Sequence, residues 1–379
     1  MKLALFFTRG ISLEQWVSQG LFDREKLIYE EHIYQNNFEK IYWFTYGSED
    51  KKISQRLKKE DKLHKDIEVI SMPRFFNIPK LGTFLYSLLI PFFYFNILKK
   101  IEVLKSNQMD GSWSALITKK IYDKKLVLRT GYTWSKLKEV TEPNSILKIR
   151  FIKFIEKMMY KNCDIAIVSS YNNKQYLNQK YGCKNINVLY NYVDLNRFYD
   201  FKNERYEDSI VFIGRLSEEK NIFSLIEASH KCNLNLKIYG NGPLREKLKQ
   251  YINENRFNST LMGSVSNSEI PKILNENKYY ALVSYQEGMP KSLMEAMACG
   301  CVCIGTDTDG INELIEDEVN GFLAKGFNIG AIEVAINTAI NFNQKEILKQ
   351  ATTFSKKYFD IKNIVTQEYG ILKGFISEN

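Results

Sequence analysis

The stretch Tyr280-Ala-Leu-Val-Ser-Tyr-Gln-Glu-Gly-Met-Pro-Lys-Ser-Leu-Met-Glu295 contains a short apolar run, a polar loop and the start of a helix. The apolar run is typical of a buried strand, and residues 291–298 have good helix propensity before Gly300 caps the helix. Pro290 suits the first helical turn and leaves the neighbouring backbone N–H groups free. These groups lie at the positive end of the helix dipole, so the stretch predicts a strand–loop–helix unit with an anion site.

The same alternation of strands and helices extends over the rest of the chain. Helical patterns separate short apolar runs, which favours parallel strands in α/β units. The expected strands are 3–7, 41–44, 67–70, 126–129, 165–169, 186–191, 210–213, 236–239, 261–262, 280–284 and 302–304. A polar stretch, 201–208, interrupts the rhythm, so we expect two α/β halves joined near residues 195–208, with ligands bound beyond the carboxyl ends of the strands, in a cleft between the halves.

The composition is that of a folded protein with a basic surface. The 379 residues are 44% hydrophobic and 26% charged, and the formal net charge is +9. The length exceeds the ~150 residues of one domain, and the positive charge favours an anionic partner. The six cysteines are scattered and the first apolar run is short for a signal peptide, which indicates a reducing cytoplasm. We interpret Cys299, Cys301 and Cys303 as small buried residues, since the chain has only three histidines to complete a metal site.

Two basic, apolar stretches of the first half have two interpretations. Residues 84–97 are nearly all apolar, are broken by Pro91 and have lysines on both sides, among them Lys105. Residues 146–161 carry Arg150 and three lysines at helical spacing. Both are too short for the ~20 residues of a membrane span. Each is typical either of a helix on an anionic membrane or of a core element with a solvated basic edge.

Two carboxylates flank the predicted anion site. Glu287 precedes the helix and Glu295 lies within it. Carboxylates repel phosphate but accept hydrogen bonds from hydroxyl groups, so the two acids suit the polyol ends of a ligand whose middle is anionic. A nucleotide-diphosphate sugar has this chemistry.

The loop that follows the strand 210–213 can supply positive charge. Gly214 permits a close approach, Arg215 offers a planar set of donors, and Lys220 offers a point charge near the next helix. A surface salt bridge is the alternative role for Lys220. The turn Gly240-Asn-Gly-Pro243 resembles part of a dinucleotide motif but lacks its third glycine, so we expect no redox cofactor.

Taken together, these motifs resemble the large family of retaining GT-B glycosyltransferases known as glycosyl transferases group 1, or family four. The resemblance covers about residues 187–324 and rests on the order and spacing of short motifs. They are Asn191-Tyr-Val-Asp194, Gly214-Arg215 with Lys220, Gly240-Asn-Gly-Pro243, Gly263-Ser-Val265, the pair Glu287 and Glu295, Gly310-Ile-Asn-Glu313 and Asn320-Gly-Phe322.

The resemblance implies a fold and a site. It implies two Rossmann-like domains facing across a cleft, at 1–195 for the acceptor and 196–353 for the donor, with a helical tail, 354–379, that returns to the first. Catalysis is assigned to Glu287, which contacts the transferred sugar, and to Arg215 and Lys220 on the diphosphate. Donor-binding positions are Gly10, Gly214, Arg215, Lys220, Gly288, Met289, Pro290, Lys291, Ser292 and Glu295, the last on the ribose. Gly240, Gly263 and Val265 are expected to border the base.

The family resemblance is weaker in the first half of the chain. The loop after the first strand has one glycine, Gly10, and neither His32 nor His64 is a clear equivalent of the histidine that family members place near the sugar. Five residues resemble acceptor-side loops, although ring packing in the core is the rival interpretation. They are Asp110, Trp113, Arg129, Tyr132 and Trp134. We expect Asp307-Thr-Asp309 to be a plain loop and no metal to be required.

The sequence thus predicts a retaining glycosyltransferase with no cofactor and no nucleic-acid partner. We expect a nucleotide-sugar donor, a lipid-linked, lipopolysaccharide or capsule acceptor in cell-envelope polysaccharide synthesis, and a peripheral location on the inner face of the plasma membrane. A nucleotide-sugar epimerase or hydrolase of the same fold is one alternative. A non-catalytic membrane-binding partner is another.

Overall fold

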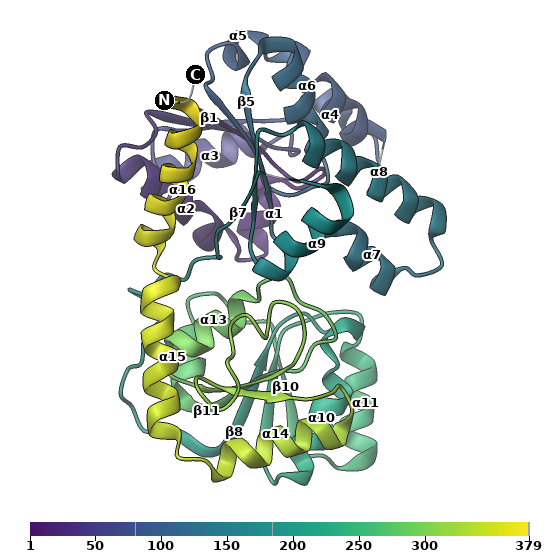
Figure 1. Cartoon of the computed structure of the whole chain (residues 1–379), viewed down its shortest axis with the longest axis vertical. Coiled ribbons are helices and arrows are strands. Elements are labelled where there is room, and N and C mark those ends of the chain that lie inside the picture. The colour runs from purple at the N-terminus through teal and green to yellow at the C-terminus, as the bar shows by residue number, and fades with distance from the viewer. Residues whose placement is uncertain (80, 184, 378–379) are drawn as a thin grey trace. The chain divides into compact units, whose positions relative to one another are not determined.

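The computed structural model describes residues 1–79, 81–183 and 185–377, and the chain divides into two compact units (Figure 1). The first unit comprises Met1–Leu189 together with the chain from Val365 onward, and the second comprises Tyr190–Ile364. Both are α/β units with a parallel sheet, as predicted.

The first unit is built on seven parallel strands in the order β3-β2-β1-β4-β5-β6-β7. Buried aliphatic residues fill β1, β5 and β6, because helices cover both faces of a parallel sheet. The strands are β1 (Lys2–Phe6), β2 (Lys40–Phe44), β3 (Ile67–Ile70), β4 (Val103–Ser106), β5 (Lys125–Thr130), β6 (Ile165–Val168) and β7 (Ile186–Val188).

The helices of the first unit connect these strands. Capping fixes some of their starts: the Ser12 hydroxyl accepts from the backbone N–H of Gln15, and Ser170 caps α9 in the same way. The helices are α1 (Leu13–Ser18), α2 (Phe22–Tyr34), α3 (Asp50–Lys59), η1 (Arg74–Phe76), α4 (Leu81–Phe93), α5 (Phe95–Leu98), α6 (Trp113–Tyr122), α7 (Trp134–Thr141), α8 (Ile146–Asn162) and α9 (Tyr171–Tyr181).

Strand β4 is absent from the sequence prediction, and it changes the interpretation of Lys105. We counted Lys105 among the basic flanks of an apolar stretch, but its side chain is 4% exposed and lies inside the sheet. The Lys105 ammonium pairs with Glu368 Oε1 at 2.6 Å, and Glu368 Oε2 lies 3.0 Å from His32 Nε2. Burial alone would raise the pKa of Glu368, but Lys105 and His32 hold it well below its usual value.

His32 is a structural member of this buried cluster. Its Nδ1 lies 3.2 Å from the Asn37 side-chain nitrogen, a donor, so Nε2 carries the ring hydrogen and donates it to Glu368. Burial lowers the pKa of His32, in keeping with a neutral ring. Glu368 lies on α16, so the cluster attaches that helix to the sheet of the first unit.

The second unit has six parallel strands in the order β10-β9-β8-β11-β12-β13. Numbered within the unit this order is 3-2-1-4-5-6, that of a Rossmann fold. The strands are β8 (Tyr206–Ile213), β9 (Asn235–Tyr239), β10 (Ser259–Gly263), β11 (Asn277–Leu282), β12 (Val302–Thr306) and β13 (Phe322–Ala324). The prediction lacks β13, a three-residue edge strand.

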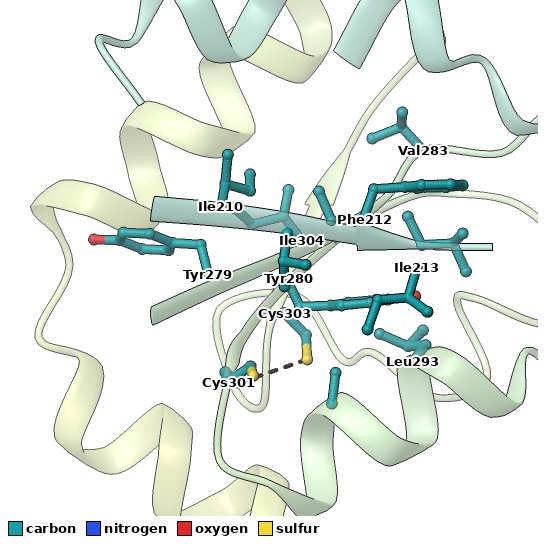
Figure 2. Packing of buried hydrophobic residues seen from close by; sticks show 14 of the residues in the cluster. Ile210, Phe212, Ile213, Tyr279, Tyr280, Val283, Leu293, Cys301, Cys303 and Ile304 are labelled. Atoms are coloured by element: carbon teal, nitrogen blue, oxygen red, sulfur yellow. Dashed lines mark hydrogen bonds between the residues drawn. The ribbon is translucent and has the colours of Figure 1, made fainter. Parts of the chain in front are cut away.

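The core of the second unit lies between this sheet and its helices (Figure 2). Leu293 of α13 lies on the same side of the sheet as Tyr280 and Cys303 in this cluster. Cys299, Cys301 and Cys303 are buried there, as predicted. The helices are η2 (Glu218–Lys220), α10 (Ile222–Lys231), α11 (Arg245–Asn255), α12 (Ile270–Glu276), α13 (Lys291–Ala298), α14 (Ile329–Asn341) and α15 (Gln344–Tyr358).

The C-terminal stretch forms two helices where the pattern predicted one over 354–376. Helix α15 ends at Tyr358 and α16 covers Ile361–Ser377. The carbonyl of Phe359 accepts from the backbone N–H of Val193, which interrupts the helical hydrogen bonds. Asp360 Oδ1 then accepts from the N–H groups of Lys362 and Asn363 and starts α16. Val193 and Phe359 both belong to the second unit, which begins at Tyr190.

Candidate active site

The candidate site of the second unit lies where its strand order reverses. Strand β8 is followed along the chain by β9 on one side of it, whereas its other neighbour, β11, is followed by β12 on the far side, so the strand order reverses between β8 and β11. Such a switch point is the usual ligand site of an open α/β sheet. The loop after β8 carries Gly214, Arg215 and Lys220, and the loop after β11 carries Ser284 and Glu287.

Lys220 and Glu287 meet at this point. Lys220 Nζ lies 2.5 Å from Glu287 Oε1, and the same oxygen accepts a 2.7 Å hydrogen bond from Ser284 Oγ. The two side chains are 18% and 11% exposed, so water screens the pair only partly. We assigned Lys220 to a phosphate and Glu287 to a sugar, and the structure places their charged groups in direct contact.

Further hydrogen bonds join the two loops. The backbone N–H of Tyr285 donates to the carbonyl of Glu219 at 2.9 Å, and the Tyr285 hydroxyl donates to Asn221 Oδ1 at 2.9 Å. Asn221 in turn donates to the carbonyl of Phe327. Lys220 and Glu287 are therefore held by backbone and side-chain contacts on either side of each.

Helix α13 begins beside these carboxylates. It starts at Lys291, and Pro290 is its N-cap residue with extended backbone angles, one position earlier than predicted. The N–H groups of its first turn point out of the helix start, the favourable end for an anion. The ammonium of Lys291 lies over the ring of Tyr192, 4.6 Å from its centroid.

A buried tyrosine lies beneath the start of this helix. The Tyr280 hydroxyl donates to Ser292 Oγ at 2.7 Å. Burial raises the pKa of Tyr280, and the nearby charges of Glu287 and Glu295 raise it further. Glu295 itself is buried, with 5% of its surface exposed.

Glycines bring the surrounding loops into close contact. Gly240 has φ +139°, and a Cβ there would come within 1.8 Å of the Gly214 carbonyl oxygen. Gly310 has φ +82°, and a Cβ there would lie 2.3 Å from the Gly288 carbonyl oxygen. The motifs Gly240-Asn-Gly-Pro243 and Gly310-Ile-Asn-Glu313 thus require glycine at their first position for packing against the loops around the site.

Two predicted donor residues differ in how they are held. Met289 is buried, and its carbonyl accepts from Asn191 Nδ2 at 3.0 Å, so it is fixed by its backbone. Arg215 is exposed, and its guanidinium makes no hydrogen bond or ion pair within the described ranges. An exposed arginine at the switch point is available to a phosphate group.

The predicted base-bordering residues lie along the ends of β9 and β10. The N–H of Gly240 donates to the carbonyl of Gly263, and Gly263 has φ +82°. Val265 is half-buried and packs against the core. Their contact with a base remains a prediction.

The first unit has a charged pair at its own switch point, between β1 and β4. Arg9 Nε lies 2.8 Å from Asp110 Oδ1, and the Arg9 backbone N–H donates to the Asp110 carbonyl. Gly10 has φ +79°, and a Cβ there would meet only open space. The Arg9 guanidinium lies over the Trp113 ring, 5.7 Å from its centroid.

The remaining acceptor candidates divide into two groups. Burial raises the pKa of Tyr132, and the charge of Asp110 raises it further. Arg129 instead donates to the carbonyl of Leu189, and Trp134 is the first residue of α7. Direct contacts therefore join Asp110 and Trp113, both through Arg9.

Two residues that support the site, Ser284 and Tyr280, were given no role in the sequence analysis. Ser284 and Tyr280 position Glu287 and Ser292, and Asn191, the first residue of a predicted motif, positions Met289. Ser284 could have been found as the first polar residue after an apolar strand. Arg9 is adjacent to the predicted Gly10, but its partner Asp110 depends on β4, which the prediction lacked.

The arrangement combines acceptors for hydroxyl groups with positive charge for an anion. Glu287 and Glu295 can accept hydrogen bonds, while Arg215, Lys220 and the start of α13 can stabilise negative charge. In the part of the chain that the structure describes, no group of three or more His, Cys, Asp or Glu side chains is arranged to hold a metal ion.

Comparison with known proteins identifies the second unit. Residues 197–357 match the family model described as Glycosyl transferases group 1. The chain spans about half the length of several curated relatives. One is the Escherichia coli UDP-Gal:alpha-D-GlcNAc-diphosphoundecaprenol alpha-1,3-galactosyltransferase, 30% identical over 182 residues that cover 43% of this chain and 46% of that protein.

Other similarities extend over most of the chain. A Campylobacter jejuni protein is 25% identical over 315 residues, which cover 80% of this chain and 84% of that protein. Its name is GalNAc-alpha-(1->4)-GalNAc-alpha-(1->3)-diNAcBac-PP-undecaprenol alpha-1,4-N-acetyl-D-galactosaminyltransferase. The structure of Anabaena HepE in complex with UDP and glucose matches with a TM-score of 0.75 at 19% identity, covering 99% of this chain and 100% of that one. This last likeness is one of fold.

Proposed function

Because residues 197–357 belong to the glycosyl transferases group 1 family and the whole chain has the GT-B fold, we propose that this protein is a retaining glycosyltransferase. It transfers a sugar from a nucleoside-diphosphate sugar to a lipid-linked acceptor in the synthesis of a cell-envelope polysaccharide. The contact between Lys220 and Glu287 at the switch point is the observation that carries this proposal.

The roles follow from the charges at this point. The donor diphosphate binds Arg215, Lys220 and the start of α13, which together offer positive charge. Glu295 accepts from the ribose and Glu287 from the transferred sugar. A bound diphosphate gives Lys220 a second anionic partner beside Glu287. The Lys220 ammonium then binds the diphosphate directly and holds Glu287, which binds the transferred sugar.

The reaction exchanges one bond at the anomeric carbon. The bond from that carbon to the diphosphate oxygen breaks, and the acceptor oxygen bonds to the same face of the sugar, so configuration is retained. The acceptor hydroxyl proton passes to the leaving phosphate oxygen. Arg215 and Lys220 stabilise the charge that develops on the leaving group, which is where fixed positive charge lowers a barrier most.

The lipid-linked acceptor is supported by the relatives and by the surface of the first unit. The names of the Escherichia coli and Campylobacter jejuni relatives each specify an undecaprenyl diphosphate carrier. Helix α8 exposes Leu147, Phe151 and Phe154 beside Arg150 and Lys157. Such a face suits an anionic membrane, so we place the protein on the inner face of the plasma membrane. Among the described residues, no helix is long and apolar enough to cross a bilayer.

A transfer assay tests the proposal. Purified protein is incubated with a panel of nucleotide sugars and lipid-diphosphate acceptors, and the product is identified by mass spectrometry and its anomeric coupling by NMR. We expect transfer with retention, and a loss of at least about 100-fold in kcat/KM for Glu287→Gln, because the change removes a charged acceptor from the site. Glu346→Gln, an exposed carboxylate on α15, is the matched control and keeps wild-type activity.

Each other outcome has a definite meaning. Full activity in Glu287→Gln would remove that residue from the site. An inverted product would refute the retaining mechanism. Cleavage of the donor at the same rate with and without acceptor would favour a hydrolase.

A further inference from the structure

The first unit contains an apolar pocket that shares one residue, Trp113, with the group at its switch point. Helices α4, α6 and α8 pack in series at one edge of this unit, and the pocket of about 310 Å³ lies among them (Figure 1). Rings and aliphatic side chains line it, among them Phe84, Leu88, Trp113, Ile117, Phe151 and Met158. Its volume is at the lower end of the range of ~300–1,000 Å³ for ligand pockets.

The polar groups of the pocket wall are already satisfied within the fold. Trp113 Nε1 donates to Ser87 Oγ at 2.9 Å, and Ser87 Oγ itself donates to the carbonyl of Phe84 at 2.6 Å. The indole therefore presents only its ring to the pocket. A ligand here gains from contact with hydrocarbon and finds no polar partner deep in the pocket.

A lysine lies on the lining of the pocket. Lys120 of α6 is exposed and is part of the lining, and α8, which supplies Phe151 and Met158 to the lining, also exposes Arg150 and Lys157. Phe151 is 53% exposed and continues the apolar lining to the surface. Hydrocarbon below and cations above suit a chain that carries an anionic head group.

Trp113 connects the pocket to the switch point of the first unit. Trp113 lines the pocket, and the Arg9 guanidinium lies over the Trp113 ring. The same guanidinium forms an ion pair with Asp110. Trp113 begins α6, directly after the loop that bears Asp110. An anionic head at Arg9 and a hydrocarbon tail in the pocket would thus contact one side chain in common.

We propose that this pocket binds the head-proximal part of the polyisoprenoid chain of the lipid-linked acceptor. The proposal rests on the proposed function for the identity of the acceptor. The connection through Trp113 favours the acceptor over a bulk membrane lipid, because a bulk lipid has no need to lie beside the switch point.

Binding of isoprenoid diphosphates in detergent-free solution tests the pocket without any catalysis. The probes are farnesyl diphosphate, with three isoprene units, and dimethylallyl diphosphate, with one, measured by equilibrium dialysis. We expect farnesyl diphosphate to bind at least about tenfold more tightly, since burial of hydrocarbon adds affinity with each carbon. Quenching of Trp113 fluorescence, absent in Trp113→Phe, should accompany binding.

Three variants locate the site. Phe151→Asp places a charge at the mouth, and Ile117→Phe fills the pocket while keeping it apolar; each should weaken farnesyl diphosphate at least about tenfold and leave dimethylallyl diphosphate unchanged. Leu147→Asp is the matched control, because Leu147 is 81% exposed on the same helix as Phe151 but is not part of the lining. It should bind both probes as the wild type does, and all three variants should melt like the wild type.

The outcomes that overturn the proposal are distinct from failure of the proposed function. Equal affinity for the two probes, or an equal loss in Leu147→Asp and Phe151→Asp, would show that the pocket does not select the chain. Displacement of farnesyl diphosphate by lysophosphatidylglycerol at equal affinity would assign the pocket to bulk lipid. If no sugar is transferred from any nucleotide sugar to any acceptor, the proposed function is wrong. The binding of farnesyl diphosphate to the pocket is measured without catalysis, so that result is independent of the transfer assay.

Discussion

Gly310 lies against the loop that carries Glu287. A Cβ at this position would meet the Gly288 carbonyl oxygen at 2.3 Å and the Glu287 carbonyl oxygen at 3.0 Å. Its φ of +82° is also one that alanine adopts only with strain. The residue therefore fixes the position of Glu287 without any side chain of its own.

Gly310→Ala should reduce transfer more than it reduces stability. The strain costs about 1–3 kcal/mol, and the displaced loop moves Glu287 away from Lys220, so we expect kcat/KM to fall at least about tenfold. Steady-state kinetics and urea unfolding measure the two effects.

Gly330→Ala is the control for this substitution. Gly330 lies in α14, where a Cβ would make only an ordinary contact of 3.6 Å with Asn328, so activity should be unchanged. Equal activity of Gly310→Ala and wild type would mean that the loop does not position Glu287.

Individual candidate residues could be named from sequence where the motif itself carries the chemistry. Glu287 and Glu295 were named from acids, a proline and a helix start in one short stretch, and Arg215 from its position after an apolar strand; their roles stay predictions. The contact between Lys220 and Glu287 was not predictable in this way. It depends on β8 and β11 being neighbours, which sequence spacing does not determine.

Helix α16 is joined to the sheet of the first unit by buried charges. Lys105, Glu368 and His32 are each about 1–4% exposed, and Lys105 and His32 each contact Glu368. Burial lowers the pKa of Lys105, and Glu368 opposes that shift, so each charge depends on the other.

Lys105→Met should destabilise the protein strongly. The change leaves the Glu368 carboxylate buried with only His32 as a partner, and loss of one member of a buried pair costs about 3–5 kcal/mol. Urea unfolding measures the free energy of unfolding. Lys349→Met, an exposed lysine on α15, should change it by less than about 0.5 kcal/mol.

The double variant Lys105→Met, Glu368→Gln separates charge from packing. It removes both charges and keeps an acceptor for His32, so we expect it to recover at least half of the loss in Lys105→Met. No recovery would indicate that lost packing of the lysine stem, rather than the unpaired carboxylate, causes the instability.

The same cluster explains why one strand escaped prediction. β4 is four residues long and contains a lysine, and a lysine in a short apolar run is typical of a surface. Its partner Glu368 lies far along the chain, so nothing local marks Lys105 as buried. β13 was not predicted for a different reason. A strand of three residues is too short to show the alternation or apolar run by which strands are identified in a sequence.

At the scale of the whole molecule, the surplus positive charge of +9 and the exposed apolar residues of α8 support membrane binding. We expect the protein to sediment with vesicles that contain phosphatidylglycerol, and less so as salt rises, because anionic lipid attracts basic residues through a screened field. Phe154→Asp, at a position that is 61% exposed, should weaken sedimentation at least about fivefold.

Val334→Asp is the matched control for vesicle binding. Val334 is 66% exposed on α14 of the second unit, so the same change of charge there should leave sedimentation as in the wild type. Equal sedimentation with neutral and anionic vesicles would contradict an electrostatic contribution.

The most direct test of the donor site is calorimetric titration with UDP, GDP, ADP and CDP. We predict that the wild type binds at least one of them, and that Arg215→Ala weakens the diphosphate at least about tenfold but the matching monophosphate much less, because we assign the guanidinium to the diphosphate, whose second phosphate the monophosphate lacks. Lys249→Ala, an exposed lysine on α11, should bind like the wild type. Absence of binding for all four, or unchanged affinity in Arg215→Ala, would contradict the assignment of a nucleotide-sugar site to this switch point.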